Sequence, residues 1–289
     1  MTLTEEDKIK IAEYRKTLGR YPKPSVTADI VAVRPTFSTL RDDQWRENPK
    51  FSLEILLIKR GQWPYEGFWA LPGGFIRPSE SVQEGARREL KEETSLEGKT
   101  LIPIGVFSDP KRDMRAWIIS NAFVSIHRRG EGAHVKGGDD AAEATWLRLA
   151  SPVMADGRFS LPFYDGARHL FTLTGTYRAE ALGGGTITSV NENPLAFDHA
   201  TIIAEAFLRL ISFDLRKLVF FFLPEKFTLA DYIGVYQYLT RDAITRNNIP
   251  NFRRQLTAIK NPPLVACARE FEDLNGRGHA AAMLYRKRG

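Results

Sequence analysis

Cysteine is almost absent from the chain, since Cys267 is the only one among 289 residues. A single cysteine cannot form a disulfide within the chain and excludes a cysteine-based zinc site. Long apolar runs are also lacking, because the longest one, residues 218–223, is far too short to span a bilayer. We interpret that run as a buried strand or a linker segment.

A secretory signal is missing from the start of the sequence. Residues 1–7 are polar and acidic, whereas a signal needs a basic stretch followed by an apolar one. We therefore expect a cytoplasmic protein that has no contact with a membrane. Hydrophobic residues make up 43% of the chain, which is enough to bury a core, and the length suits two domains.

The positive charge of the chain is concentrated near its end. Residues 224–289 contain eleven Lys/Arg and six Asp/Glu, a balance of +5, which leaves +1 of the total +6 for residues 1–223. An apolar run ends at Leu223 and Pro224 follows it, so we predict a first domain over 1–223 and a second over 224–289. The basic tail favours an anionic partner such as nucleic acid, although a surface that only aids solubility would have the same charge.

Hydrophobic periodicity predicts alternating helices and strands in the first domain. We expect helices over 4–18, 82–94 and 201–210, and strands over 26–33, 54–59, 101–107, 116–126 and 145–147. Ser81 and Glu84 form a capping box at the start of the second helix. Residues 34–50 are predicted to be a loop. Residues 151–193 contain a hairpin signal and are interpreted as an insertion of unknown role.

Acidic residues gather on one face of the predicted helix 82–94. Glu92 and Glu93 follow Glu89 by three and four residues, and Glu80 precedes the helix. Carboxylates on one face repel each other, and Mg²⁺ or Mn²⁺, which prefer oxygen ligands, would supply the counter-charge. The alternative is a solvated acidic face of an exposed helix.

Two further features surround these carboxylates. Arg88 lies four residues before Glu92, and we expect it to orient that carboxylate rather than contact a substrate. Gly73 and Gly74 would let the backbone bend tightly and approach phosphates or the start of the helix.

Together these residues resemble the Nudix signature, which reads Gly, five residues, Glu, seven residues, Arg-Glu, an aliphatic residue, any residue, Glu-Glu, any residue, Gly and an aliphatic residue. The chain matches it at Gly74, Glu80, Arg88, Glu89, Leu90, Glu92, Glu93 and Leu96. Ser95 stands where the family has Gly, and we expect it to take over the helix C-cap at modest cost. The resemblance implies an α/β/α sandwich around a mixed sheet. It also implies metal-dependent hydrolysis of a nucleoside diphosphate linked to another group, with the four glutamates at the metal.

The segment 105–115 resembles the corresponding part of ADP-ribose pyrophosphatases and their regulatory relatives. The resemblance implies an ADP-ribose-like ligand, and Lys111, Arg112 and Arg115 are suited to contact its phosphates or ribose. A solvent-exposed charged loop is the alternative. The general base stays open between the glutamates of the signature and acidic residues such as Glu131 or Glu143.

The tail has the order helix, turn, helix and hairpin, which predicts a winged helix-turn-helix. We expect helices over 229–239, capped by Thr228, and 248–259, then strands over 264–271 and 280–285. Such modules place a helix in the major groove of double-stranded DNA and a basic wing beside its backbone. The predicted DNA contacts are Asn251, Arg253, Arg254 and, at the wing, Arg277. A dimerisation or docking module is the alternative.

Three stretches of the tail, 223–229, 251–254 and 284–286, resemble Nudix-related transcriptional regulators of NAD metabolism, as does 195–199. The resemblance implies a homodimer whose Nudix domain senses ADP-ribose and whose winged helix binds an operator. His199 would bind a ligand or, as part of an Asp-His pair at a helix start, have a structural role. Two hypotheses result: a hydrolase that cleaves ADP-ribose, and an ADP-ribose-sensing regulator with little or no catalysis.

Overall fold

The computed structural model describes residues 4–38, 50–98, 100–128, 141–150, 152–180, 185–212, 215–240, 249–257, 264–272 and 282–287. The helices are α1 (Glu5–Thr17), η1 (Leu18–Arg20), α2 (Val82–Thr94), α3 (His199–Ser212), α4 (Leu215–Phe222), α5 (Leu229–Thr240) and α6 (Ile249–Thr257). The strands of the large sheet are β1 (Ser25–Ser38), β2 (Lys50–Arg60), β3 (Trp69–Ala70), β4 (Gly73–Phe75), β5 (Leu101–Phe107), β6 (Ile118–Ile126), β7 (Ala141–Leu149), β8 (Val153–Ala155), β9 (Arg158–Asp165), β10 (Arg168–Ala179) and β11 (Gly185–Val190). A second sheet contains β12 (Phe227–Thr228), β13 (Leu264–Glu272) and β14 (Ala282–Lys287).

The large sheet is mixed and runs in the order β11-β10-β9-β7-β2-β1-β6-β5. β1 and β6 are parallel, whereas β1 is antiparallel to both β2 and β4. The two antiparallel partners use different halves of β1: β4 pairs with residues 27–29 and β2 with residues 33–38. This division brings the Gly73-Gly74 backbone to the centre of the sheet.

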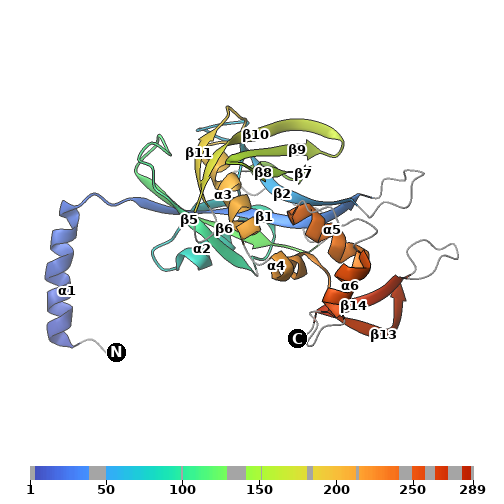
Figure 1. The fold of residues 1–289 in the computed structure, drawn as a ribbon. Helices are drawn as coiled ribbons and strands as arrows, with labels where there is room; N and C mark the ends of the chain where they lie inside the picture. Colours follow the sequence, from blue (N-terminus) through green and yellow to red (C-terminus); the bar gives the residue numbers. More distant parts are fainter. Residues whose placement is uncertain are drawn as a thin grey trace.

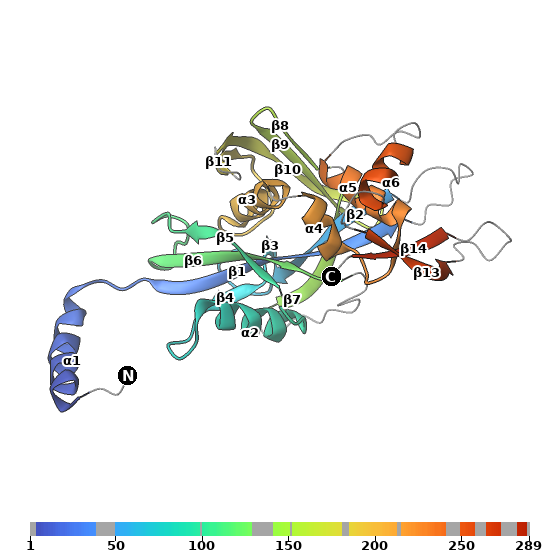
Figure 2. The ribbon, with the colours of Figure 1, turned by 60° about the horizontal axis from the view of Figure 1, so that its bottom comes forward.

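Helices α2 and α3 cover opposite faces of the sheet (Figure 2). On β1, Ile30 and Ala32 belong to the core under α2, whereas Val31 and Val33 belong to the core under α3. This alternation follows from the two-residue period of a strand, and it requires apolar side chains on both faces. The predicted α/β/α sandwich with a mixed sheet is therefore confirmed.

Within residues 151–193, interpreted above as an insertion, the described parts 153–180 and 185–190 form β8 to β11 and extend one side of the large sheet. The predicted hairpin is present, because β10 and β11 pair antiparallel from Gly175 with Val190 to Ala179 with Gly185. Leu161, Phe163 and Leu173 are buried in the same core as α3. The segment is thus a structural part of the sheet.

Two local expectations were wrong. Residues 218–223 are not a strand or linker, because Leu218, Val219 and Phe222 are the buried face of helix α4, and Phe221 is exposed. Spacings of three and four residues suit a helix, but a run of six apolar residues conceals them. The predicted loop 34–50 is also shorter than expected, because residues 34–38 continue β1 and pair with residues 50–54.

The C-terminal elements follow the predicted order of two helices and two strands (Figure 1). Thr228 caps α5 as expected: its hydroxyl accepts from the Asp231 backbone N–H at 3.2 Å and donates to the Asp231 carboxylate at 2.8 Å. The tail also contacts the large sheet, since the Tyr238 hydroxyl donates to the Leu149 carbonyl at 2.9 Å. Arg277 lies outside the described residues.

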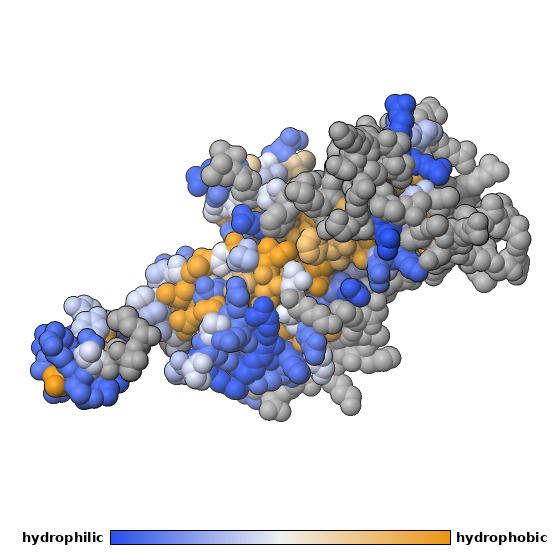
Figure 3. Space-filling model, turned by 90° about the horizontal axis from the view of Figure 1, so that it is seen from below, coloured by the Kyte–Doolittle hydropathy of each residue, from blue (hydrophilic) through white to orange (hydrophobic). Residues whose placement is uncertain are grey.

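The first helix, α1, projects away from the rest of the molecule (Figure 1). Thr4 and Asp7 form its predicted capping box. None of its residues is buried, and Ile9 and Tyr14 are 61% and 65% exposed, so its apolar side chains do not pack on a core. Seen from below, α1 and the outside of α2 are largely hydrophilic, and an apolar band lies beside α2 (Figure 3). Across the described residues, every helix is too short or too polar to cross a membrane.

Candidate active site

Arg88 organises three of the four predicted metal-binding glutamates. Its Nη1 donates to Glu89 at 2.6 Å and to Glu92 at 2.9 Å, and its Nη2 donates to Glu80 at 2.6 Å. Nη2 also donates to the Phe75 carbonyl at 3.0 Å, which ties the cluster to the end of β4. The helical spacing accounts for the contact with Glu92, and the turn before α2 brings in Glu80.

The electrostatics of this cluster favour charged side chains. Hydrogen bonds from the Arg88 guanidinium and from the Arg77 backbone lower the pKa of Glu80 to about 2. The same contact with Glu80, followed by those with Glu89 and Glu92, raises the pKa of Arg88. Glu80 is therefore ionised at neutral pH, and the guanidinium supplies positive charge among the carboxylates.

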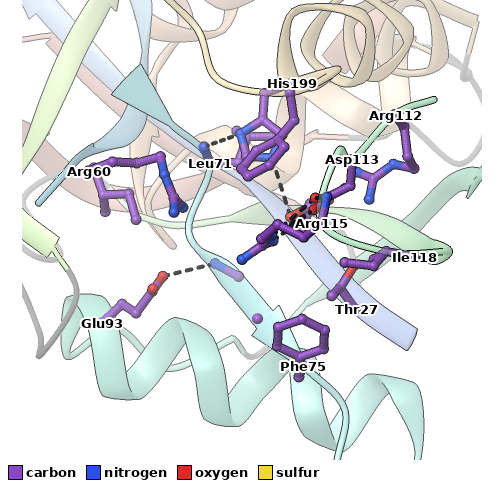
Figure 4. Close-up of a pocket in the computed structure, with 15 residues that line it drawn as sticks. Thr27, Arg60, Leu71, Phe75, Glu93, Arg112, Asp113, Arg115, Ile118 and His199 are labelled. Atoms are coloured by element: carbon purple, nitrogen blue, oxygen red, sulfur yellow. Dashed lines mark hydrogen bonds and ion pairs between the residues drawn. The ribbon is translucent and has the colours of Figure 1, made fainter. Parts of the chain in front are cut away.

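Glu93 is separate from this cluster and faces a pocket (Figure 4). Its carboxylate accepts from the Gly73 backbone N–H at 2.8 Å, which joins α2 to β4. Gly74 lies against the neighbouring Glu89, because a Cβ on Gly74 would be 2.6 Å from the Glu89 carboxyl carbon. A side chain at position 74 would therefore push the Glu89 carboxylate out of its place.

The chemistry of these donors fits a hard divalent cation. All four predicted ligands are carboxylates, which are the type of ligand that Mg²⁺ and Mn²⁺ prefer. Within the described residues, no group of three or more acidic, histidine or cysteine side chains is arranged as a ready metal site. Arg88 balances the carboxylate charge in this arrangement, so an ion would take over contacts that the guanidinium now makes.

The pocket beside Glu93 lies between the β4 end of the sheet and the start of α3. It is lined by Thr27, Asp29, Ile58, Arg60, Leu71, Gly73, Gly74, Phe75, Glu93, Arg112, Asp113, Arg115, Ile118, Phe197 and His199. Charged, apolar and backbone groups are mixed in this lining, as in the binding sites of small molecules.

A buried network of ion pairs and hydrogen bonds lies at the pocket and contributes Arg112, Asp29 and His199 to its lining. The Arg112 guanidinium donates to both carboxylate oxygens of Asp198, at 2.7 and 2.9 Å, and to Asp29 at 3.2 Å. Ser120 also donates to Asp29, at 2.5 Å. Burial opposes ionisation of this carboxyl, but His199, Ser120 and Arg112 outweigh it and hold the pKa of Asp29 below its usual range. The network fixes the start of α3 against β1.

His199 has a defined tautomer in this network. Its Nδ1 accepts from the Leu71 backbone N–H at 2.9 Å, so Nε2 carries the proton when the ring is neutral. Nε2 lies 3.6 Å from an Asp29 oxygen and is directed toward the pocket (Figure 4). Both alternatives for His199 therefore have geometric support, since the ring holds the backbone and also lines the pocket.

The sequence pattern of the NUDIX domain matches residues 44–164, which contain the carboxylate helix and the glycines beside it. The chain carries a Nudix domain. It is 47% identical over 96 residues to the ADP-ribose pyrophosphatase of Methanocaldococcus jannaschii, covering 33% of this chain and 55% of that protein. It is 31% identical over 118 residues to the ADPR responsive transcriptional repressor NtrR of Acinetobacter baylyi, covering 40% of this chain and 41% of that protein. The chain thus matches about half the length of these relatives.

Two solved structures share the fold over nearly the whole chain. A MutT/nudix family protein from Enterococcus faecalis has a TM-score of 0.63 at 23% identity, with all of both chains covered. Shewanella oneidensis NrtR complexed with a 27mer DNA has a TM-score of 0.54 at 22% identity, covering 91% of this chain and 93% of that one. Both the Nudix domain and the C-terminal elements therefore have a counterpart in known folds.

The Nudix signature departs from its pattern at Ser95, and the structure shows how serine is accommodated. Ser95 takes the left-handed C-cap conformation, with φ 58° and ψ 12°, and its N–H donates to the Lys91 carbonyl at 2.8 Å. The predicted C-cap is confirmed. Leu96 behind it is buried, so the helix end stays anchored.

The predicted cations of the segment 105–115 differ in their positions. Arg112 and Arg115 line the pocket, whereas Lys111 is exposed and does not. Of the acidic residues considered as general bases, Glu143 is exposed on β7 and bonded to Thr145, and Glu131 lies outside the described residues. The side chain of Glu143 does not reach the pocket lining.

Several pocket residues were missed by the sequence analysis. Asp29 carried a signal, because a charged residue followed by Ile30 and Val31 in a buried strand needs a buried partner. Arg60 and Phe197 carried no such signal, since their segments are brought together only by the fold.

Proposed function

We propose that the chain is a metal-dependent pyrophosphohydrolase that cleaves ADP-ribose or a related nucleoside diphosphate derivative. The observation that carries this proposal is the contact between Glu93 and Gly73, which places a carboxylate of the Nudix signature at the edge of a pocket containing Arg115. The likeness to the Methanocaldococcus jannaschii enzyme supports the choice of substrate.

In this proposal water adds to one phosphorus and the bridging P–O bond breaks, which yields AMP and ribose 5-phosphate. Glu89, Glu92 and Glu93 would hold Mg²⁺ or Mn²⁺, assisted by Glu80. The ion would supply positive charge to the diphosphate and activate the attacking water. Accordingly, AMP should be released from ADP-ribose only when a divalent cation is added, which chromatography of the products measures.

The remaining residues of the proposed site bind the diphosphate or hold charged side chains in position. Gly73 and Gly74 allow the phosphates to approach the sheet, since side chains are absent there. The positive charge of Arg115 lies in the same pocket, and Asp113 fixes its guanidinium at 2.7 Å. Arg88 keeps the carboxylates of α2 close together by balancing their repulsion.

The two glycines give a matched pair of predictions. A Cβ on Gly73 would overlap the Ala28 backbone carbonyl within the β1–β4 pairing, so we expect Gly73→Ala to destabilise the fold by about 1–3 kcal/mol. A Cβ on Gly74 would meet only the end of the flexible Glu89 side chain. Gly74→Ala should therefore keep most of its stability but lose hydrolysis. Urea denaturation and AMP release measure the two effects, and equal stability losses would contradict this assignment.

A second function, DNA binding controlled by an ADP-ribose-like ligand, is favoured by the C-terminal elements. Helix α6 carries exposed Asn251, Arg253 and Arg254, and β13 and β14 follow it as a hairpin. The likenesses to the Acinetobacter repressor and to NrtR with DNA support this candidate. We propose that the chain acts as a homodimer in this role, because half-sites in operators mirror the two-fold symmetry of dimers.

The DNA-binding proposal predicts a salt effect. Replacing Arg253 and Arg254 by alanine should weaken binding to a mixed-sequence duplex and lower the salt slope by about 2, one for each lost phosphate contact. Fluorescence anisotropy over a range of KCl concentrations measures both quantities. Replacing Arg168 and Arg178, both exposed on β10, by alanine removes the same charge and is the matched control. Unchanged binding by the double variant would exclude α6 as the DNA-binding helix.

A further inference from the structure

Phe197 stands out among the residues that line the pocket. It directly precedes Asp198 of the buried ion network, and its backbone is left-handed, with φ 54°. Tyr65, whose ring meets the Phe197 ring edge-on at 4.8 Å, is also left-handed, with φ 60°. Bulky residues rarely adopt this conformation, and strain of this kind gathers at functional sites. The fold thus keeps these two aromatic rings in contact even though both residues adopt an unfavourable backbone conformation.

Two guanidinium groups lie on the Phe197 ring. Arg60 Cζ is 5.1 Å from the ring centroid and Arg115 Cζ is 5.2 Å from it. Arg115 also lies 5.8 Å from the ring of Phe75 on the opposite side of the pocket. Both cations are held in place, because Arg60 Nε donates to the Pro64 carbonyl at 2.7 Å and Arg115 donates to Asp113. The result is a set of planar groups with fixed positions at one end of the pocket.

A planar heteroaromatic ring is the ligand part that suits these groups. Aromatic rings and guanidinium planes stack on the π face of a nucleobase, and neither ribose nor phosphate has a π face. Gly73, Gly74 and Glu93, which the proposed function assigns to the diphosphate and its metal, line the same pocket, so one ligand can reach both ends. We infer that Phe197, flanked by Arg60 and Arg115, seats the base of the nucleotide and determines the preference for nucleoside diphosphate derivatives.

This inference rests on the proposed nucleotide site, but binding measurements test it without turnover. The two products of the proposed reaction, AMP and ribose 5-phosphate, carry the same phosphate and differ in the base. Calorimetry on Phe197→Leu should show AMP affinity reduced at least tenfold, in line with the loss of one stacking contact, and ribose 5-phosphate affinity unchanged. Phe197→Trp should retain AMP binding, because it keeps a stacking face.

The same variants separate base binding from folding and from hydrolysis. Phe68→Leu is the control, since Phe68 packs on Tyr65 at 5.6 Å but does not line the pocket. If Phe197→Leu does not fold, Arg60→Leu takes its place and should weaken AMP binding severalfold. Equal losses for both ligands, no rescue by tryptophan, or no AMP binding by the wild type would overturn the inference. Selective loss of AMP binding in a protein that never cleaves ADP-ribose would refute the proposed hydrolysis. It would still support Phe197 as the residue that binds the base.

Discussion

Replacing Glu93 by glutamine is expected to reduce hydrolysis of ADP-ribose by more than about a hundredfold while the protein stays folded. The amide oxygen of glutamine can still accept the hydrogen bond from the Gly73 N–H, so the link between α2 and β4 survives. The negative charge is lost, and with it a ligand that the proposed metal needs. Even the loss of a group that only supports a metal ligand costs 10- to 100-fold, so the loss of a direct ligand should exceed that range.

A matched control for Glu93 is available on the same segment. Glu97 is exposed just after the end of α2 and lies outside the Nudix signature. Glu97→Gln changes the net charge by the same amount and should keep wild-type turnover. Circular dichroism and thermal melting establish that both variants fold. Wild-type turnover by Glu93→Gln would remove Glu93 from the catalytic assignment.

Replacing Arg112 by methionine is expected to destabilise the protein by about 3–5 kcal/mol, the usual cost of removing one partner of a buried ion pair. The Arg112 side chain is 4% exposed and serves both Asp198 and Asp29. Methionine fills part of the space, but the buried Asp29 loses the guanidinium and keeps only its contacts with His199 and Ser120. Urea denaturation measures the change, and Lys111→Met, at the exposed neighbouring position, should stay close to the wild type.

The pH dependence of this destabilisation has a defined sign. The pKa of Asp29 is lowered in the folded protein, so its contribution to stability is complete above the unfolded pKa of about 3.9. That contribution is lost as the pH falls through the folded pKa. The difference between wild type and Arg112→Met should therefore be largest near neutral pH and shrink in acid. A constant difference down to low pH would show that the loss comes from packing alone.

Local sequence signals were sufficient to predict helix α2, which carries three of the four predicted metal-binding glutamates. The Ser81–Glu84 capping box and the spacing of the glutamates follow from short-range rules, and both are present in α2. The same rules failed for α4, where a continuous apolar run has no visible period. They predicted the hairpin within residues 151–193 but not the place of this segment in the large sheet, which depends on pairing between β7 and β9.

The pocket could be predicted only in part, because its residues come from distant segments. Arg112 was expected to contact phosphate or ribose, yet its guanidinium is engaged by Asp198, 86 residues away. No local pattern specifies that pairing. Phe197 and Arg60 likewise come from distant segments and meet only in the folded chain. The spacing of the glutamates was thus enough to predict the carboxylate cluster, whereas the residues that line the pocket could not be predicted from local patterns.

Release of AMP from ADP-ribose is the most direct test of whether the carboxylates of α2 serve catalysis. The purified full chain is incubated with ADP-ribose and Mg²⁺, and AMP is quantified over time with and without EDTA. We predict turnover on the order of 1 s⁻¹ or faster, an ordinary enzymatic rate, that EDTA abolishes. Tight binding of ADP-ribose without release of AMP would contradict this account, and the ligand-controlled DNA-binding role would then take its place.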